Sequence, residues 1–303
     1  MPRVSILLTC FNHRAFIEQA VEGLRSQTYR DLEVIAIDDG STDGTREWLS
    51  EQPDITLVFN PNNIGTYATL NVGLEKATGE FIAVLNDDDV WLPDKLDRQV
   101  AMMDERLSVG LVHTGGHFID GAGAKQEGNP LGFRFPTFET GDLLLGLVYE
   151  NKIIASAALA RRACFERLGG FDESYFGSGD WQMWYRIAEE YEVGFVNEPL
   201  TLYRVHGANA SHKLERIWRD DERLRTWMVP RLDRLANRFS PQDSQKAIAF
   251  NWAALGTVQA LNGRPSEARD SFRSSTKLAP LRLKSYLRYL ATFLPAAAFR
   301  KTI

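Results

Sequence analysis

FIAVLNDDD, residues 81 to 89, is the stretch that decides the fold. Its first five residues form a short continuous apolar run, which is typical of a parallel strand covered on both faces by helices. Three adjacent carboxylates follow: Asp87, Asp88 and Asp89. Ligands of open parallel sheets bind beyond the carboxyl ends of the strands, and adjacent like charges are costly there unless a cation or polar partners offset them. We therefore predict a site for Mg²⁺ or Mn²⁺, with a solvated acidic turn as the alternative.

The first 115 residues alternate strand and helix patterns around this stretch. The expected strands are VSILLT, LEVIAID, ITLVFN, FIAVL and VGLVHT, and the expected helices are 16–27, 45–51, 67–78 and 93–105. Strands that alternate with helices of about ten residues indicate βαβ units. The pattern predicts an α/β fold with a mainly parallel central sheet and helices on both faces.

The rest of the chain reads differently. Residues 120–137 are a Gly- and Pro-bearing loop, and mixed elements follow, with a helix from about Asp142, a strand at Ile153 to Ala160 and a helix near Asp180. From Lys213 onward the pattern is helical. The stretch 252–280 resembles one tetratricopeptide helix pair, which we interpret as an appendage, with partner docking as the alternative.

Composition and charge narrow the function classes. The hydrophobic fraction of 44% is ordinary for a folded protein, and the two cysteines, Cys10 and Cys164, suggest no disulfide framework. The apolar start is broken by polar residues at once, so we expect neither a signal peptide nor an anchor, and a cytoplasmic protein. Residues 1–210 carry a net charge of -15 and residues 211–303 one of +10. An acidic front half needs a metal to hold a phosphorylated ligand, whereas the basic rear can face anionic phospholipid.

Polar groups also follow the first two expected strands. Thr9, Phe11 and Asn12 end the first, and Asp39 ends the second. A carboxylate such as Asp39 can accept the imide N–H of uracil, and Phe11 offers a face for base stacking. Helix capping is the alternative for the neighbouring Ser41 and Thr42.

Seven ordered motifs carry a family resemblance over about residues 3 to 211. They are ILLTCFN, IAIDDGSTDGT, NNIGTYATLNVGL, ATGEFIAVLNDDDVWLPDKL, LGGFDE, GDWQMWYRIA and YRVHGANAS. Together they resemble the inverting family-2 glycosyltransferases of the GT-A fold. The resemblance implies a nucleotide-sugar donor, most often a UDP-sugar, and a divalent metal on the aspartate motif.

The resemblance also implies roles for individual residues. Asp88, Asp89 and His206 would bind the metal. The implied nucleotide-sugar contacts are Thr9, Phe11, Asn12, Asp39, Asn71, Asp87 and Arg204. For Asn71, a helix-packing amide is the alternative. Leu70 stands where relatives often carry a phosphate-binding arginine, which makes metal neutralisation more important.

Asp180 matches the catalytic base of that family, although Gly179 replaces the usual preceding glutamate. Such a base takes the proton of the acceptor hydroxyl as it attacks the anomeric carbon. Capping of the following helix is the alternative, and both roles can coexist. Trp181 is a candidate acceptor contact or a core residue.

The sequence therefore predicts a GT-A domain at 1–211, with a nucleotide-sugar half at 1–115 and an acceptor half at 116–211, and a helical extension at 212–303. The expected activity is metal-dependent, inverting sugar transfer to a glycan or lipid-linked acceptor, as in cell wall or polysaccharide biosynthesis. The alternatives are a nucleotide-sugar-binding or partner-docking protein without turnover, and a nucleotidyltransferase. We expect no nucleic acid partner, and possible peripheral contact of the basic C-terminal helices with the inner face of the membrane.

Overall fold

The computed structural model describes residues 1–128, 130–132, 134–294 and 299. The chain forms two compact units. The first, the sheet unit, comprises residues 1–143, 152–175 and 179–209. The second, the helical unit, comprises residues 144–151, 176–178 and 210–303, so it includes two short segments that the sequence assigned to the first domain.

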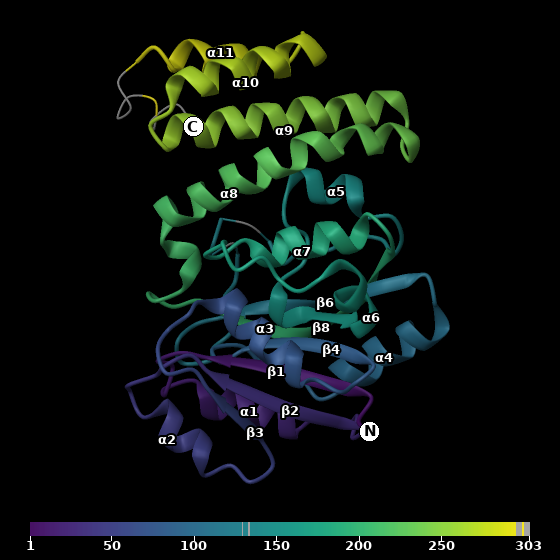
Figure 1. Ribbon diagram of the computed structural model, residues 1–303, viewed down its shortest axis with the longest axis vertical. Coiled ribbons are helices and arrows are strands. Elements are labelled where there is room, and N and C mark those ends of the chain that lie inside the picture. Colours follow the sequence, from purple (N-terminus) through teal and green to yellow (C-terminus); the bar gives the residue numbers. More distant parts are fainter. Residues whose placement is uncertain (129, 133, 295–298, 300–303) are drawn as a thin grey trace. The chain divides into compact units, whose positions relative to one another are not determined.

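The sheet unit contains one eight-stranded sheet in the order β3-β2-β1-β4-β7-β6-β8-β5 (Figure 1). The strands are β1 (Val4–Cys10), β2 (Leu32–Asp38), β3 (Thr56–Phe59), β4 (Phe81–Asn86), β5 (Val90–Trp91), β6 (Val109–Ile119), β7 (Ala158–Arg161) and β8 (Glu192–Arg204). The pairings among β1 to β4 are parallel, and β6 pairs in parallel with β8. Strand β7 pairs antiparallel with β4 and β6, and β5 pairs antiparallel with β8. Every residue of β1 is buried, as expected for a strand covered on both faces.

The helices of the sheet unit connect these strands. They are α1 (Ile17–Arg25), α2 (Thr45–Ser50), α3 (Thr66–Lys76), α4 (Lys95–Glu105), α6 (Arg162–Leu168) and α7 (Gly179–Ala188). In α1 the buried side chains Ile17, Ala20, Val21 and Leu24 recur at helical spacing, so one stripe packs on the sheet. The alternation predicted for the first 115 residues is confirmed.

One predicted strand, at residues 153–160, is shorter in the structure than the sequence indicates. The sequence pattern predicts a strand over all of these residues, whereas the structure has a 3-10 helix, η1 (Ala155–Ala157), before the short strand β7. The bend turns Ser156 toward the end of β4, where its hydroxyl donates to Asp89 and accepts from the Asn86 N–H. The Trp91 indole donates to its carbonyl at 2.6 Å. Apolar composition alone did not reveal these polar contacts.

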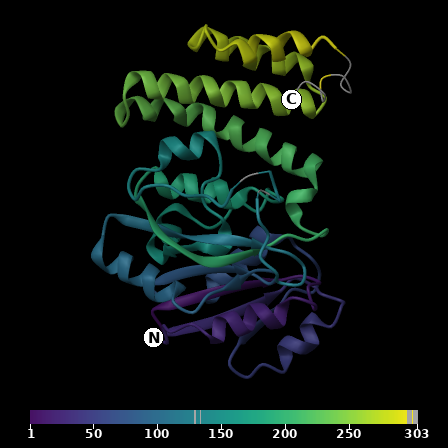
Figure 2. The same ribbon diagram turned by 180° about the vertical axis from the view of Figure 1, so that it is seen from behind.

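The helical unit contains α5 (Leu144–Tyr149), η2 (Ala210–His212), α8 (Leu214–Met228), η3 (Val229–Asn237), α9 (Pro241–Leu261), α10 (Pro265–Leu278) and α11 (Leu283–Ala291) (Figures 1 and 2). The expected helix pair at 252–280 corresponds to the end of α9 and all of α10. Gly263, with a φ of 79°, makes the turn between them, and Gly256 lies against Phe272. None of the described helices is long and apolar enough to cross a membrane.

Candidate active site

The carboxyl ends of β1 and β4 bring two distant segments together. The two strands pair in parallel with Thr9 opposite Asn86, and the Thr9 hydroxyl donates to the Asn86 side chain at 3.2 Å. The residues that follow each strand therefore lie side by side. Residues 10–13 meet the three aspartates at this edge, as the strand order requires.

His13, Asp88 and His206 form a group whose potential metal-ligating atoms all lie within 4.8 Å of one another. The His206 Nε2 lies 3.0 Å from Asp88 Oδ2. The two imidazole rings meet edge to face with centroids 5.2 Å apart, and the Phe16 ring packs against both. Two imidazoles and one carboxylate are a donor set suited to a divalent transition metal, so these residues fit one.

Asp87 orients His13. Its Oδ1 lies 2.7 Å from the His13 Nδ1, and its Oδ2 accepts the backbone N–H of Phe11 at 3.0 Å. Burial disfavours the His13 cation, but the bond to Asp87 and the negative charges of Asp87, Asp88 and Asp43 outweigh it and raise the pKa of His13 to about 9. The site thus has a strong preference for positive charge. With Nδ1 held by Asp87, the Nε2 of His13 is the atom left for a metal.

Asp89 and Arg204, predicted as a metal ligand and a donor contact, are used inside the protein. One oxygen of Asp89 accepts the Arg204 backbone N–H at 2.9 Å, and the other accepts the Ser156 hydroxyl. The Arg204 guanidinium donates to the carbonyls of Asp88, Asp120 and Gly121 and to the Gln19 side chain. Both side chains are buried. These contacts fasten the aspartate loop to β8. A carboxylate with two such contacts keeps further lone-pair positions, so the metal contact of Asp89 and the donor contact of Arg204 stay predictions.

Asp39 holds the loop that follows β3. Its carboxylate accepts the N–H groups of Ile64 and Gly65 at 2.9 and 3.0 Å and the Asn60 amide at 3.0 Å. Gly40, with a φ of 78°, lets the chain pass this loop, since a Cβ would lie 2.8 Å from the backbone of Asn62. A carboxylate has about four lone-pair positions, so a contact to a base stays a prediction for Asp39.

Asn12 and Phe11 lie beside Asp39 in the same edge of the sheet. Asn12 has a φ of 54°, and its side chain accepts the Thr42 N–H at 2.8 Å, so it joins the ends of β1 and β2. The Phe11 ring is 40% exposed. Exposed apolar area of this kind is available for stacking.

Asn71 has the contacts of a packing amide. It accepts the Phe171 N–H at 2.8 Å and donates to the Phe171 carbonyl and to Glu173 at 2.9 Å each. A Cβ on Gly170 would lie 2.4 Å from the Asn71 oxygen, so the turn fits closely around the amide. These contacts are those of a helix-packing amide, the alternative stated above, and a donor contact of Asn71 stays a prediction.

Asp180 lies in the first turn of α7, half-buried. Its Oδ1 accepts the Trp181 N–H at 2.7 Å and lies 3.4 Å from the Tyr67 hydroxyl. A Cβ on Gly179 would lie 2.8 Å from the Tyr67 ring, so a glutamate at 179 would displace that ring. The departure from the family pattern at this position thus has a steric reason. Trp181 is half-buried, whereas Trp184 is a core residue.

His13 is the site residue that the sequence did not reveal. Its hydrogen-bond partner, Asp87, is 74 residues away in the sequence, so no short motif contains both residues. The signal lay in the predicted parallel order, because residues just after neighbouring strands converge at one edge. The predicted loop 120–137 includes residues 129 and 133, which lie outside the described residues.

The chain matches the family described as Glycosyl transferase family 2 over residues 5–169, more than half of its length. The chain belongs to this family. An uncharacterized glycosyltransferase of Nostoc sp. is 31% identical over 232 residues, which cover 68% of this chain and 66% of that protein. The first curated relatives are thus matched over just under two thirds of their own length.

Solved structures share the fold of this family 2 member. S. aureus TarS 1-349 in complex with UDP-GlcNAc superposes with a TM-score of 0.74 at 15% identity, covering all of this chain and 90% of that one. The mannosyltransferase PcManGT from Pyrobaculum calidifontis, in complex with GDP-Man and Mn²⁺, gives a TM-score of 0.59 at 22% identity, covering 98% and 86%. The predicted GT-A fold with C-terminal helices is confirmed.

Proposed function

We propose that this family 2 member is a metal-dependent inverting glycosyltransferase, which moves a sugar from a nucleotide-sugar, preferably a UDP-sugar, to a glycan or lipid-linked acceptor. The observation that carries the proposal is the cluster of His13, Asp88 and His206 at the carboxyl edge of the sheet. Its donor set suits a metal that accompanies a diphosphate. The TarS structure with UDP-GlcNAc, which has the same fold, supports a nucleotide-sugar donor.

The metal in this proposal is held by His13, Asp88 and His206, with Asp87 orienting His13. A hydrogen bond to the second ring nitrogen typically fixes the tautomer and orientation of a metal-binding imidazole. Two imidazole ligands favour Mn²⁺ over Mg²⁺, which prefers oxygen. The Mn²⁺ complex of PcManGT agrees with this choice. When bound, the metal offsets the negative charge of the departing nucleoside diphosphate.

The donor is proposed to lie along the ends of β1, β2 and β4. Phe11 stacks on the base, while Thr9, Asn12, Asp39 and Asp87 offer polar contacts to the base, ribose or sugar. We assign Asn71, Asp89 and Arg204 to the framework, because their side chains are engaged by the protein itself. These residues position the contacts rather than make them.

Asp180 is the proposed general base. The oxygen of an acceptor hydroxyl attacks the anomeric carbon from the face opposite the diphosphate, the carbon–oxygen bond to the diphosphate breaks, and the hydroxyl proton passes to the Asp180 carboxylate. One displacement inverts the anomeric centre. The Tyr67 hydroxyl, 3.4 Å away, helps to orient the carboxylate, and the N-terminal turn of α7 favours its ionised form. Trp181 is proposed to contact the acceptor.

Turnover of UDP-glucose and UDP-GlcNAc with Mn²⁺, followed by mass spectrometry, tests this proposal. We expect Asp180→Asn to lower turnover by about 10²- to 10⁴-fold, the usual contribution of a general base. Asp233→Asn, which changes the same group on η3, is the control. Donor binding with no metal-dependent turnover by the intact chain would indicate a binding protein instead, and release of pyrophosphate would indicate a nucleotidyltransferase.

A cytoplasmic location with peripheral contact to the inner face of an anionic membrane is the last part of the proposal. Seven large apolar side chains on and beside α11 are each at least 42% exposed: Leu281, Leu283, Tyr286, Leu287, Leu290, Phe293 and Leu294. Arg282, Lys284 and Arg288 lie among them, and no acidic residue follows Asp270. Such a helix suits an anionic bilayer surface. The predicted basic segment also includes 295–298 and 300–303, which lie outside the described residues.

Vesicle flotation tests the membrane contact. The intact chain should float with vesicles that contain phosphatidylglycerol, and the double variant Leu287→Asp, Leu290→Asp should not. Leu107→Asp, at a leucine that is 80% exposed in the sheet unit, is the matched control. Equal flotation of all three proteins would contradict the assignment to α11.

A further inference from the structure

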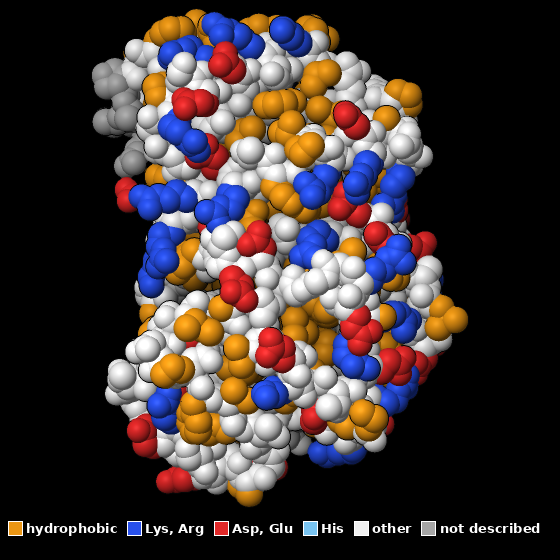
Figure 3. Space-filling view, viewed as in Figure 1, with side chains coloured by type: hydrophobic (Ala, Val, Ile, Leu, Met, Phe, Trp, Pro, Cys, Tyr) orange, Lys and Arg blue, Asp and Glu red, His pale blue; other side chains and the backbone are white. Residues whose placement is uncertain are grey.

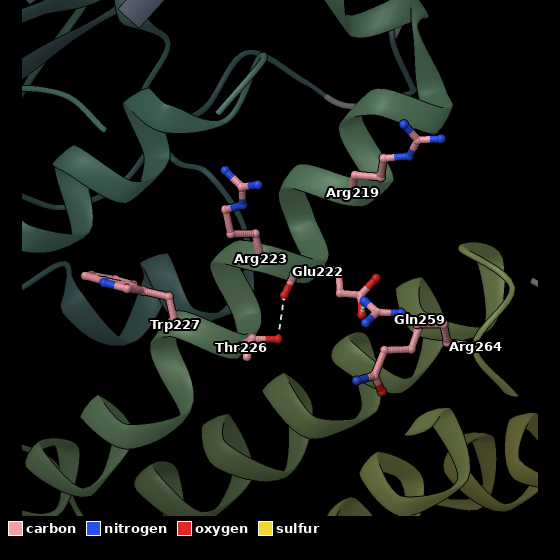
Figure 4. A pocket seen from close by; sticks show the side chains of 7 residues that line it. All are labelled: Arg219, Glu222, Arg223, Thr226, Trp227, Gln259 and Arg264. Carbon is pink, nitrogen blue, oxygen red and sulfur yellow. Dashed lines mark hydrogen bonds and ion pairs between the residues drawn. The ribbon is translucent and has the colours of Figure 1, made fainter. Parts of the chain in front are cut away.

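The helical unit contains a hollow that the proposed chemistry does not use (Figure 4). Its volume is about 640 Å³, within the range of small-ligand sites. The lining residues come from α8, α9 and the turn before α10: Arg219, Glu222, Arg223, Thr226, Trp227, Gln259 and Arg264. Figure 3 shows basic side chains gathered over α8 on this face. We propose that this hollow binds an acidic saccharide, a sugar segment that carries a carboxylate or phosphate group.

The charge of the hollow favours an anion. Three arginines line it, against one carboxylate, that of Glu222. This carboxylate is buried and already paired, since it forms an ion pair with Arg264 and accepts the Asn262 amide at 2.7 Å. Glu222 is therefore not available to offset the charge of Arg219. Arg219 has no ion-pair partner among the described residues, and guanidinium groups bind carboxylate and phosphate in a bidentate manner.

The remaining lining residues favour a sugar over a bare anion. Trp227 brings an aromatic ring to the lining, a group of the kind that packs on the apolar side of a saccharide, and the Arg231 guanidinium lies over that ring, 3.8 Å from its centroid. The Gln259 oxygen accepts the Ser271 hydroxyl at 2.7 Å, which leaves its NH₂ group to donate elsewhere. Thr226 is bonded to the Glu222 carbonyl at 2.8 Å, so its position is fixed.

The spacing along α8 places the key groups on one face. Arg219, Arg223 and Trp227 are four residues apart, so they form a continuous stripe along the helix surface. Such a stripe matches an extended chain better than a compact ion. This inference rests on the proposed function, in which an acidic glycan of this kind is the acceptor or part of it.

Binding without any donor tests the inference separately from turnover. Trigalacturonate and glucose 6-phosphate are the acidic probes, maltotriose is the neutral one and inorganic phosphate is the bare anion, each titrated by calorimetry into the intact chain. We expect the two acidic sugars to bind, and maltotriose and phosphate to bind at least about tenfold more weakly. Asp180→Asn should keep the affinity even where it abolishes transfer.

Two variants localise the site. Arg219→Gln, Arg223→Gln should lower the affinity for trigalacturonate at least about tenfold, since two exposed guanidinium groups are lost. Arg216→Gln removes the same charge from α8 at a residue that stacks on Phe176 outside the hollow, and should change it less than about twofold. Absence of binding, equal binding by the double variant, or phosphate binding as tight as that of the acidic sugars would each overturn the inference.

Discussion

His13 and His113 lie in the same sheet unit but have opposite surroundings. His13 is bonded to Asp87 and faces Asp88 and Asp43, and its pKa is raised to about 9. His113 lies in β6, fully buried among the rings of Phe135, Phe138 and Phe195. Burial and the nearby Lys95 lower the pKa of His113 to about 3. One imidazole is in a cation-favouring site and the other in a cation-excluding one.

The difference teaches where this unit can do chemistry. Around His113 the groups are apolar or cationic, so the ring is structural. Around His13 there are more carboxylates than cationic groups to pair with them, because the guanidinium of Arg204 donates to backbone carbonyls and to Gln19 instead. In the proposed function, a metal ion offsets that excess of negative charge. The comparison predicts that changes at the first histidine site affect metal binding and those at the second affect stability.

Asp88→Asn should have the largest effect. It removes the charged oxygen that faces His206, and we expect a loss in kcat/KM of more than about 100-fold, beyond what loss of an outer hydrogen-bond partner costs. Rates with UDP-glucose at several Mn²⁺ concentrations measure it. Asp94→Asn, at the start of α4, is the control and should stay close to the intact enzyme. Unchanged, metal-saturable turnover in Asp88→Asn would remove Asp88 from the metal site.

Asp87→Asn should have the next largest effect, through the His13 orientation. Asparagine keeps an oxygen near the His13 Nδ1 but removes the charge, and such changes typically weaken metal binding about 10- to 100-fold. Electron paramagnetic resonance of free Mn²⁺ measures the affinity without substrate. His113→Leu should leave it unchanged. If the two variants bind Mn²⁺ equally well, the contrast between the two histidine sites has no bearing on metal binding.

The sequence predicted the position of the site, at the carboxyl edge of the sheet, better than the roles of its individual residues. Apolar runs and the three aspartates located the edge, and Asp88 and His206 do lie together there. The sequence could not show which polar side chains form hydrogen bonds with one another, because these contacts join residues that only the tertiary fold brings together. Asp89 accepts the Ser156 hydroxyl only because the chain forms the 3-10 helix η1 at that residue. Asn71 forms a hydrogen bond with the Phe171 carbonyl, 100 residues away.

His113→Leu should have the smallest effect, a change in how the free energy of unfolding depends on pH. An unfolded histidine has a pKa near 6.5, whereas the folded value is about 3, so below pH 6.5 the unfolded chain binds a proton that the folded chain does not. Stability contributed by the neutral ring is complete above pH 6.5 and is lost as the pH falls toward 3, by about 1.4 kcal/mol per pH unit. Urea denaturation followed by tryptophan fluorescence at pH 7, 6 and 5 should show a shallower pH dependence in His113→Leu. His117→Leu, four residues along β6, should flatten the slope less, because burial also lowers the pKa of His117 but its ring is much less buried. Parallel slopes for the intact chain and His113→Leu would mean that water or a rearranged Lys95 stabilises the His113 cation, and the environment would then not exclude charge.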